Sequence, residues 1–196
     1  MDKIFVAFYK KKERLLDKLI MFTSRGPYSH VELILPTLGS ISSSPRDNGT
    51  RFKEISKMNF NDKDKWDIFE LDLRGFGLDI NKLTKYFEET KTSKDLHNGR
   101  NNYDFLSVIF YHILRLNFLP KIKKNHFICS EFVWEALENI LVIKEENIVT
   151  KEYSKRYREF NKGYKFTPAN VLTSLTAMGL IKKILLEGDK DGFRLS

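Results

Sequence analysis

The chain has 196 residues, of which 41% are hydrophobic and 13% aromatic, and its 16 Phe exclude an intrinsically disordered polypeptide. The single Cys excludes an internal disulfide and a Cys-rich zinc site, and it fits a reducing compartment. The formal net charge of +8 predicts a basic surface, and the length predicts one domain over residues 1–196.

Predicted strands dominate the first part of the chain. Alternating or β-branched segments predict strands over the ranges 4–9, 29–35, 39–44, 50–55 and 66–73. The third and fourth of these form a predicted hairpin around a turn-forming sequence at 45–49. Residues 13–22 predict a short helix whose apolar face carries Leu15, Leu16, Leu19 and Ile20.

Predicted helices dominate the second part, over the ranges 79–89, 104–116, 129–141 and 167–178. The last has Thr167 as its N-cap, Pro168 in its first turn and Gly179 at its end. A polar loop or short helix is expected at 147–163 and a closing strand at 180–186. This order predicts an α+β fold in which a mostly antiparallel sheet packs against helices, including the helix that begins at Cys129.

The only cysteine, Cys129, lies where a helix is predicted to begin. A helix N-terminus carries partial positive charge and unsatisfied N–H groups, which favour a thiolate and can bind an oxyanion. A buried structural Cys is the alternative interpretation.

A histidine stands at the start of the second predicted strand. Neutral His30 can act as a general base toward a thiol and then protonate a leaving group. Strand alternation places Glu32 on the same face, where it can orient the ring through Nδ1 or face solvent. Among the other histidines, His126 is the second candidate base, because it is close to Cys129 in sequence, while His97 and His112 have weaker contexts.

Together these segments resemble the permuted branch of the NlpC-type papain-like superfamily, the YiiX-like cysteine hydrolases. Related groups are lecithin:retinol acyltransferase-like proteins, a poxvirus family and uncharacterised phage proteins. The stretches that carry the resemblance are 22–31 (FTSRGPYSHV), 103–106 (YDFL), 127–133 (FICSEFV) and 166–172 (FTPANVL). The stretch 42–51 (SSSPRDNGTR) is most similar to phage members.

The resemblance implies a circularly permuted papain-like fold with Cys129 as nucleophile and His30 as base. In this family the third polar residue lies on the strand after the His strand, where this chain offers only Ser42, Ser43 and Ser44. We therefore expect Glu32 to orient the imidazole, with Ser43 as the alternative. Tyr28, Ser130 and Glu131, which flank the pair, are the expected substrate-binding residues, although Glu131 can also simply stabilise its helix.

The expected function is that of a cysteine hydrolase that cleaves an amide, ester or thioester through an acyl-enzyme. Its substrate would be a peptide, a cell-wall peptide or an acyl lipid, and we expect no metal or cofactor. The alternative is an inactive papain-like fold that serves as a binding or structural protein of a virion.

The basic surface allows attraction to an anionic membrane or cell wall. Nucleic-acid binding is not expected, because the chain has no helix-turn-helix, zinc-finger or RNA-binding signature. The longest apolar stretch, 105–119, is shorter than the ~20 residues that span a bilayer, and no signal-peptide pattern is present. A cytoplasmic or virion-associated location is therefore expected.

Overall fold

The computed structural model describes residues 3–45, 47, 49–72, 76–78, 80–95, 128–143 and 167–183. The helices are α1 (Leu15–Ser24), α2 (Ile80–Asp95), α4 (Cys129–Ile140), α6 (Pro168–Ala177) and the short 3-10 helix η1 (Ile55–Lys57). The strands are β1 (Phe5–Tyr9), β2 (His30–Leu35), β3 (Gly39–Ser44), β4 (Gly49–Lys53), β5 (Trp66–Leu71), β6 (Phe76–Leu78), β7 (Leu141–Ile143) and β8 (Ile181–Lys183).

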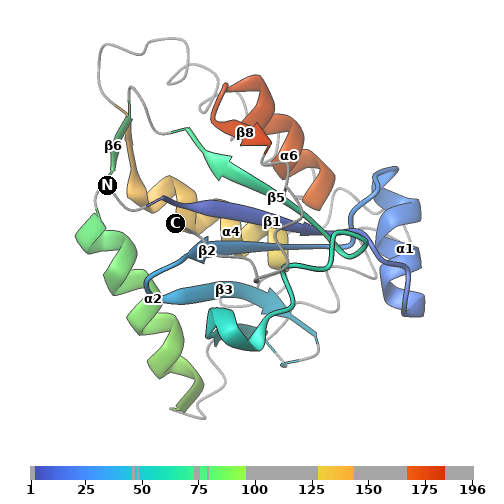
Figure 1. Cartoon of the computed structure of the whole chain (residues 1–196), viewed down its shortest axis with the longest axis horizontal. Helices are drawn as coiled ribbons and strands as arrows, with labels where there is room; N and C mark the ends of the chain where they lie inside the picture. The colour runs from blue at the N-terminus through green and yellow to red at the C-terminus, as the bar shows by residue number, and fades with distance from the viewer. Residues whose placement is uncertain are drawn as a thin grey trace, which may run out of the picture.

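A six-stranded sheet forms the centre of the fold, with the strand order β4-β3-β2-β1-β5-β8 (Figure 1). Every neighbouring pair is antiparallel, and the central strand β1 pairs with β2 on one side and β5 on the other. In a separate two-stranded sheet, β6 pairs with β7. The predicted α+β class, with a mostly antiparallel sheet, is confirmed.

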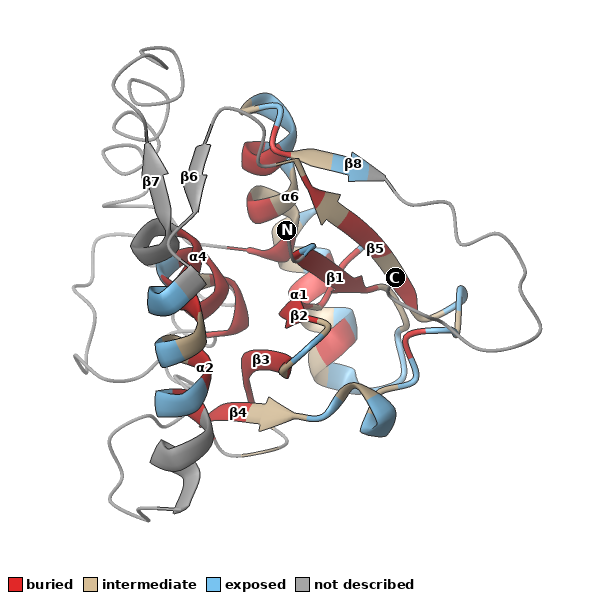
Figure 2. Cartoon of the chain, turned by 60° about the vertical axis from the view of Figure 1, so that its left-hand side comes forward, coloured by how far each residue is buried: buried red, intermediate tan, exposed pale blue. Residues whose placement is uncertain are grey.

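Helices cover one face of the sheet. Helix α4 packs against β2 and β3, and it also contacts α2 and α6 (Figure 2). The core on this face includes Val31, Leu33 and Leu35 from β2 and Phe132, Val133 and Leu137 from α4. The predicted packing of the Cys129 helix against the sheet is therefore confirmed.

A smaller apolar cluster covers the opposite face. It joins Tyr9 and Ile34 of the sheet to Phe60 and Trp66, with Ile55 from η1 packed against it. Because side chains alternate along a strand, Glu32 lies on the same face as Ile34 and not among the core residues under α4.

Most predicted elements lie within a few residues of their observed positions. Helix α6 has the expected cap, since the Asn170 N–H donates to Thr167 Oγ1 at 3.1 Å, and Gly179 follows it with φ of 65°. Helix α2 continues to Asp95, past the predicted end. The short strands β6 and β7 were not predicted. The predicted elements at 104–116 and 147–163 lie outside the described residues.

The predicted buried face of α1 is partly wrong. Leu15 is 83% exposed, and the buried stripe consists of Asp17, Ile20 and Met21. Ile20 packs against Ile128 rather than against a broad sheet face, so the helix buries only a narrow stripe. The first helical residue, Leu15, therefore projects into solvent.

Candidate active site

Cys129 is the first residue of α4, as the sequence predicts. The first intrahelical hydrogen bond runs from the Phe132 N–H to the Ile128 carbonyl, so the Cys129 N–H precedes the helical ladder. Glu131 caps the N-terminus of α4, because its Oε2 accepts a hydrogen bond from the Ile128 N–H at 3.4 Å. The Cys129 side chain belongs to the core under the helix and is only 3% exposed.

His30 interacts with both Cys129 and Glu32. Its Nε2 lies 3.3 Å from Glu32 Oε1, and its ring is close enough to the Cys129 side chain for the two groups to interact electrostatically. As the first residue of β2, His30 stands where the strand begins, which lets its ring reach a residue of the strand and a residue of α4. The carboxylate engages Nε2 and not the expected Nδ1, so Nδ1 is the nitrogen available to sulfur.

The electrostatic surroundings favour a charged imidazole. Burial of the ring lowers the pKa of His30, but the negative charges and hydrogen bonds of Cys129 and Glu32 outweigh this effect and raise it to about 9. These surroundings therefore favour an imidazolium at neutral pH.

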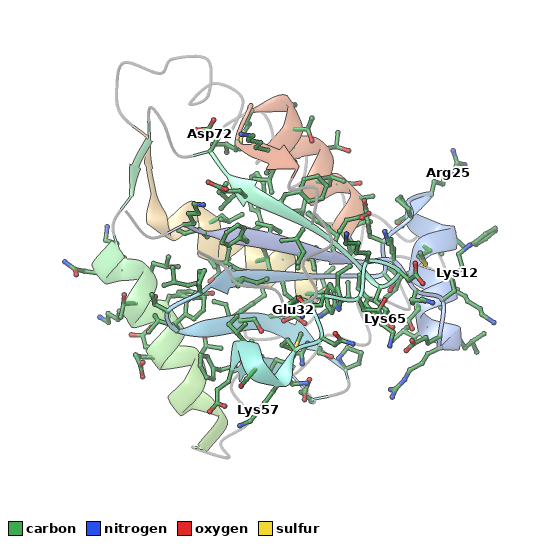
Figure 3. The ribbon with its side chains drawn as sticks, viewed as in Figure 1. Lys12, Arg25, Glu32, Lys57, Lys65 and Asp72 are labelled. Atoms are coloured by element: carbon green, nitrogen blue, oxygen red, sulfur yellow. The ribbon has the colours of Figure 1, made fainter. Side chains whose placement is uncertain are left out.

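Glu32 is completely buried and still charged. Burial raises the pKa of this carboxyl, but the nearby Arg51 guanidinium and the His30 ring bring it below its usual value. Arg51 Nη2 on β4 donates directly to Glu32 Oε1, the same oxygen that faces His30. Figure 3 shows Glu32 within the sheet, whereas the labelled Lys12, Arg25 and Lys57 project from the surface.

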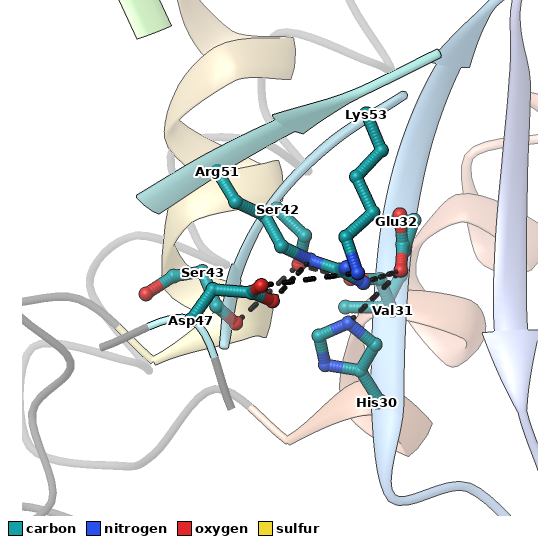
Figure 4. Close-up of polar contacts among 8 residues, drawn as sticks. All are labelled: His30, Val31, Glu32, Ser42, Ser43, Asp47, Arg51 and Lys53. Carbon is teal, nitrogen blue, oxygen red and sulfur yellow. Dashed lines mark hydrogen bonds and ion pairs between the residues drawn. The ribbon is translucent and has the colours of Figure 1, made fainter. Parts of the chain in front are cut away.

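The charged cluster extends from Arg51 into the β3–β4 turn. Arg51 Nε lies 3.2 Å from Asp47 Oδ2, and Lys53 Nζ lies 3.8 Å from Asp47 Oδ1. Figure 4 shows Arg51 between Asp47 and Glu32, with His30 below them and directed at the same Glu32 oxygen. Charges of alternating sign thus run from Lys53 through Asp47, Arg51 and Glu32 to His30.

Sequence reasoning missed Arg51 and Asp47. The hairpin itself was predicted, but its register was not. The observed register places Arg51 opposite Ser42 of β3, the strand next to β2. The long Arg51 side chain lies two strands from Glu32, and it can reach that carboxylate because the intervening Ser42 is small.

The serines proposed as alternatives to Glu32 have other surroundings. Ser42 Oγ donates to the Val31 carbonyl at 2.7 Å, and Ser43 is buried opposite Thr50 in the hairpin. Among the described residues, the side-chain contacts of His30 are those with Glu32 and Cys129. The geometry favours Glu32 over Ser43 as the group that orients the ring.

The residues expected to bind substrate have clear local contacts. Tyr28 Oη donates to Asp67 Oδ2 at 2.7 Å, and burial together with Asp67 raises the pKa of this phenol. Ser130 is completely buried, and Glu131 interacts with its own helix end. Substrate contact by these three residues stays a prediction. The histidines 97, 112 and 126 lie outside the described residues.

In the described part of the chain, no group of three or more His, Cys, Asp or Glu side chains is placed to hold a metal ion. No helix in the described ranges is long and apolar enough to cross a membrane.

No protein-family model matches the chain, and no curated protein matches it either.

Proposed function

We propose that this protein is a cysteine hydrolase with a circularly permuted papain-like fold, in which Cys129 is the nucleophile and His30 the general base and acid. The supporting observation is the position of His30, which interacts with Cys129 through one side of its ring and with Glu32 through Nε2 at 3.3 Å. Acyl transfer by a triad needs a nucleophile that contacts a base and a base that contacts an orienting carboxylate, and Cys129, His30 and Glu32 are arranged in this way.

The chain order supports the permuted fold. The histidine strand β2 precedes the cysteine helix α4, and α4 packs against β2 and β3 of the antiparallel sheet. In this arrangement the helix N-terminus presents Cys129 beside the first residue of β2. The conserved papain-like order of Cys before His is thereby reversed along the chain, while the two side chains still meet.

The proposed reaction uses the substrate carbonyl and one water. The Cys129 thiolate attacks the carbonyl carbon, and the new oxyanion is stabilised by the Cys129 N–H at the positive end of α4. The His30 imidazolium then donates its proton to the leaving amine, alcohol or thiol. Neutral His30 next removes a proton from water, whose oxygen attacks the thioester carbonyl and releases the acid and the thiolate.

Alkylation of Cys129 tests the proposal, because no other thiol competes. Iodoacetamide reacts with thiolates, and a free thiol with a pKa of ~8.5 is almost wholly protonated at pH 6. We expect rapid alkylation at pH 6 in the wild type. In His30→Ala we expect the alkylation rate at pH 6 to fall by at least about tenfold. The exposed Lys57→Ala variant, remote from the site, is the matched control.

A second candidate function is an inactive papain-like binding protein, which the burial of Cys129 favours. Alkylation at pH 9 separates the two candidates, because every accessible thiol reacts there regardless of His30. A hydrolase should be alkylated at both pH values. Slow reaction at pH 6 and pH 9, with no effect of His30→Ala, would instead support the inactive protein.

A further inference from the structure

A cavity of about 370 Å³ lies beside His30, on the side of the sheet opposite the core under α4. Its described walls come from α1, from the strand ends at Tyr9, His30 and Trp66, and from the β3–β4 hairpin. This volume falls at the small end of the range that holds small organic ligands.

Most of the wall is apolar. Leu16 and Ile20 of α1 face Tyr9, Trp66 and Met58, and the rings of Tyr9 and Trp66 pack edge to face with centroids 5.0 Å apart. Such a surface fits a short hydrocarbon group or an apolar side chain.

The wall also approaches the nucleophile. Ile20 packs against Ile128, the residue directly before Cys129, and His30 lines the cavity itself. A group bound in the cavity would therefore lie next to the imidazole and close to the start of α4.

Cations outnumber anions around the cavity. Arg14, Arg51 and Lys53 line it, whereas Asp17 is the one carboxylate among its described lining residues. Arg51 is held by Glu32 and Asp47, and Lys53 lies near Asp47, which leaves the exposed Arg14 as the cation best placed to meet a ligand charge.

A buried hydroxyl that has no partner among the described residues lines the same cavity. Ser29 is 2% exposed, and no residue that the structure describes hydrogen-bonds to its Oγ, although its N–H donates to the Tyr9 carbonyl at 2.9 Å. Native proteins rarely leave a buried polar group unsatisfied, so this hydroxyl points to a missing ligand atom.

From these observations we infer that the cavity is the acyl-side subsite of the proposed hydrolase and that it takes a short apolar acyl group ending in a carboxylate or other anion. The assignment of the cavity as an acyl-side subsite rests on the proposed hydrolase function. The binding of such a group in the cavity does not depend on that function. The apolar walls hold the chain, Ser29 donates to a polar atom, and Arg14 meets the anion.

Two esters of equal chain length test the preference. Mono-p-nitrophenyl glutarate carries a carboxylate where p-nitrophenyl pentanoate carries a methyl group. We expect kcat/KM to be roughly fivefold higher for the glutarate ester, the size of one partly exposed ion pair. Arg14→Gln should reduce this ratio, whereas Lys57→Gln, on a lysine outside the cavity, should leave it unchanged.

Ser29→Ala separates a ligand-binding hydroxyl from a structural one. Removing an unsatisfied buried hydroxyl should leave the melting temperature equal or higher, while kcat/KM for both esters falls. A lower melting temperature with unchanged kcat/KM would show that Ser29 is structural and would count against the inference.

A binding measurement keeps the inference separate from the proposed function. Trp66 lines the cavity, so its fluorescence in Cys129→Ser should report monomethyl glutarate more strongly than methyl pentanoate. Binding without turnover by the wild type would support the cavity and overturn the hydrolase. Turnover of both esters at equal kcat/KM, with no preferential binding, would overturn the inference and leave the hydrolase standing.

Discussion

Arg51 on β4 donates to Glu32 on β2 across the intervening strand β3, and both side chains are buried. The oxygen that accepts this hydrogen bond also faces His30 Nε2. Arg51 thus keeps Glu32 charged inside the protein, and the charged Glu32 in turn supports the imidazolium. Stability and the proposed chemistry depend on the same ion pair.

Removing one partner of this pair should be costly. Arg51→Met leaves the Glu32 carboxylate buried without its main counter-charge, so we expect the free energy of unfolding to fall by about 3 kcal/mol. The double variant Glu32→Gln/Arg51→Met should regain much of this loss, because it no longer buries an unpaired charge. Urea denaturation of the two single variants and the double variant measures the coupling. Additive losses would show that the pair is not coupled.

The hydrogen bond from His30 Nε2 to Glu32 predicts a specific kinetic effect. With Arg51→Met as background, Glu32→Gln removes the negative charge that helps to hold the His30 proton. The alkaline limb of kcat/KM for an amide substrate, where His30 with its pKa of about 9 loses the proton that the leaving amine needs, should therefore move to lower pH. Measurement of kcat/KM from pH 5 to pH 10 checks this. An unchanged profile would assign the orienting role to another residue.

Raising the pKa of His30 also links folding to pH. The ordinary pKa of 6.5 applies to the unfolded chain and about 9 to the folded one. The folded state therefore holds a proton that the unfolded state releases, so this stabilisation is complete below pH 6.5 and is lost as pH rises through 9. The proton that Cys129 gives up in the proposed thiolate–imidazolium pair offsets part of this gain, so we expect the wild type to lose less than about 3 kcal/mol of unfolding free energy across this window.

Two variants isolate the contribution of His30 to that pH dependence. Cys129→Ser removes the thiolate that raises the His30 pKa, and His30→Gln removes the titrating group itself. Both should flatten the dependence of the free energy of unfolding between pH 6.5 and pH 9. Wild-type slopes in both variants would mean that other groups cause the effect.

The sequence was sufficient to predict the elements with strong periodicity. The alternation of β1 and β2, the turn between β3 and β4 and the cap at Thr167 are local signals, and each predicted its element correctly. The pairing of His30 with Glu32 followed from alternation alone, because both lie on one strand.

The parts that the sequence did not reveal depend on contacts between distant segments. Arg51 meets Glu32 only because β4 and β2 flank the same strand. Leu15 is exposed because α1 packs on Ile128 through a narrow stripe, a fact that an apolar pattern cannot convey. The strands β6 and β7 each have three residues, too few to show a period.

Gly26 provides a test of how the loop before His30 is held. After α1, Arg25 adopts a left-handed conformation with φ of 52°, and the Gly26 N–H bonds back to the Met21 carbonyl. A Cβ on residue 26 would overlap the Ala169 Cβ in the first turn of α6. We expect Gly26→Ala to destabilise the fold by about 1–3 kcal/mol through this overlap, as measured by urea denaturation.

The compensating change is on the helix. Ala169→Gly removes the overlapping methyl group, so the double variant should be more stable than the sum of the two single losses predicts. Gly179→Ala is the matched control, because its φ of 65° strains an alanine but nothing lies within 4 Å of the new Cβ. Its loss should add to that of Ala169→Gly without coupling. If the losses of Gly26→Ala and Ala169→Gly also added without coupling, the loop would shift freely, and α6 would not hold the turn leading into His30.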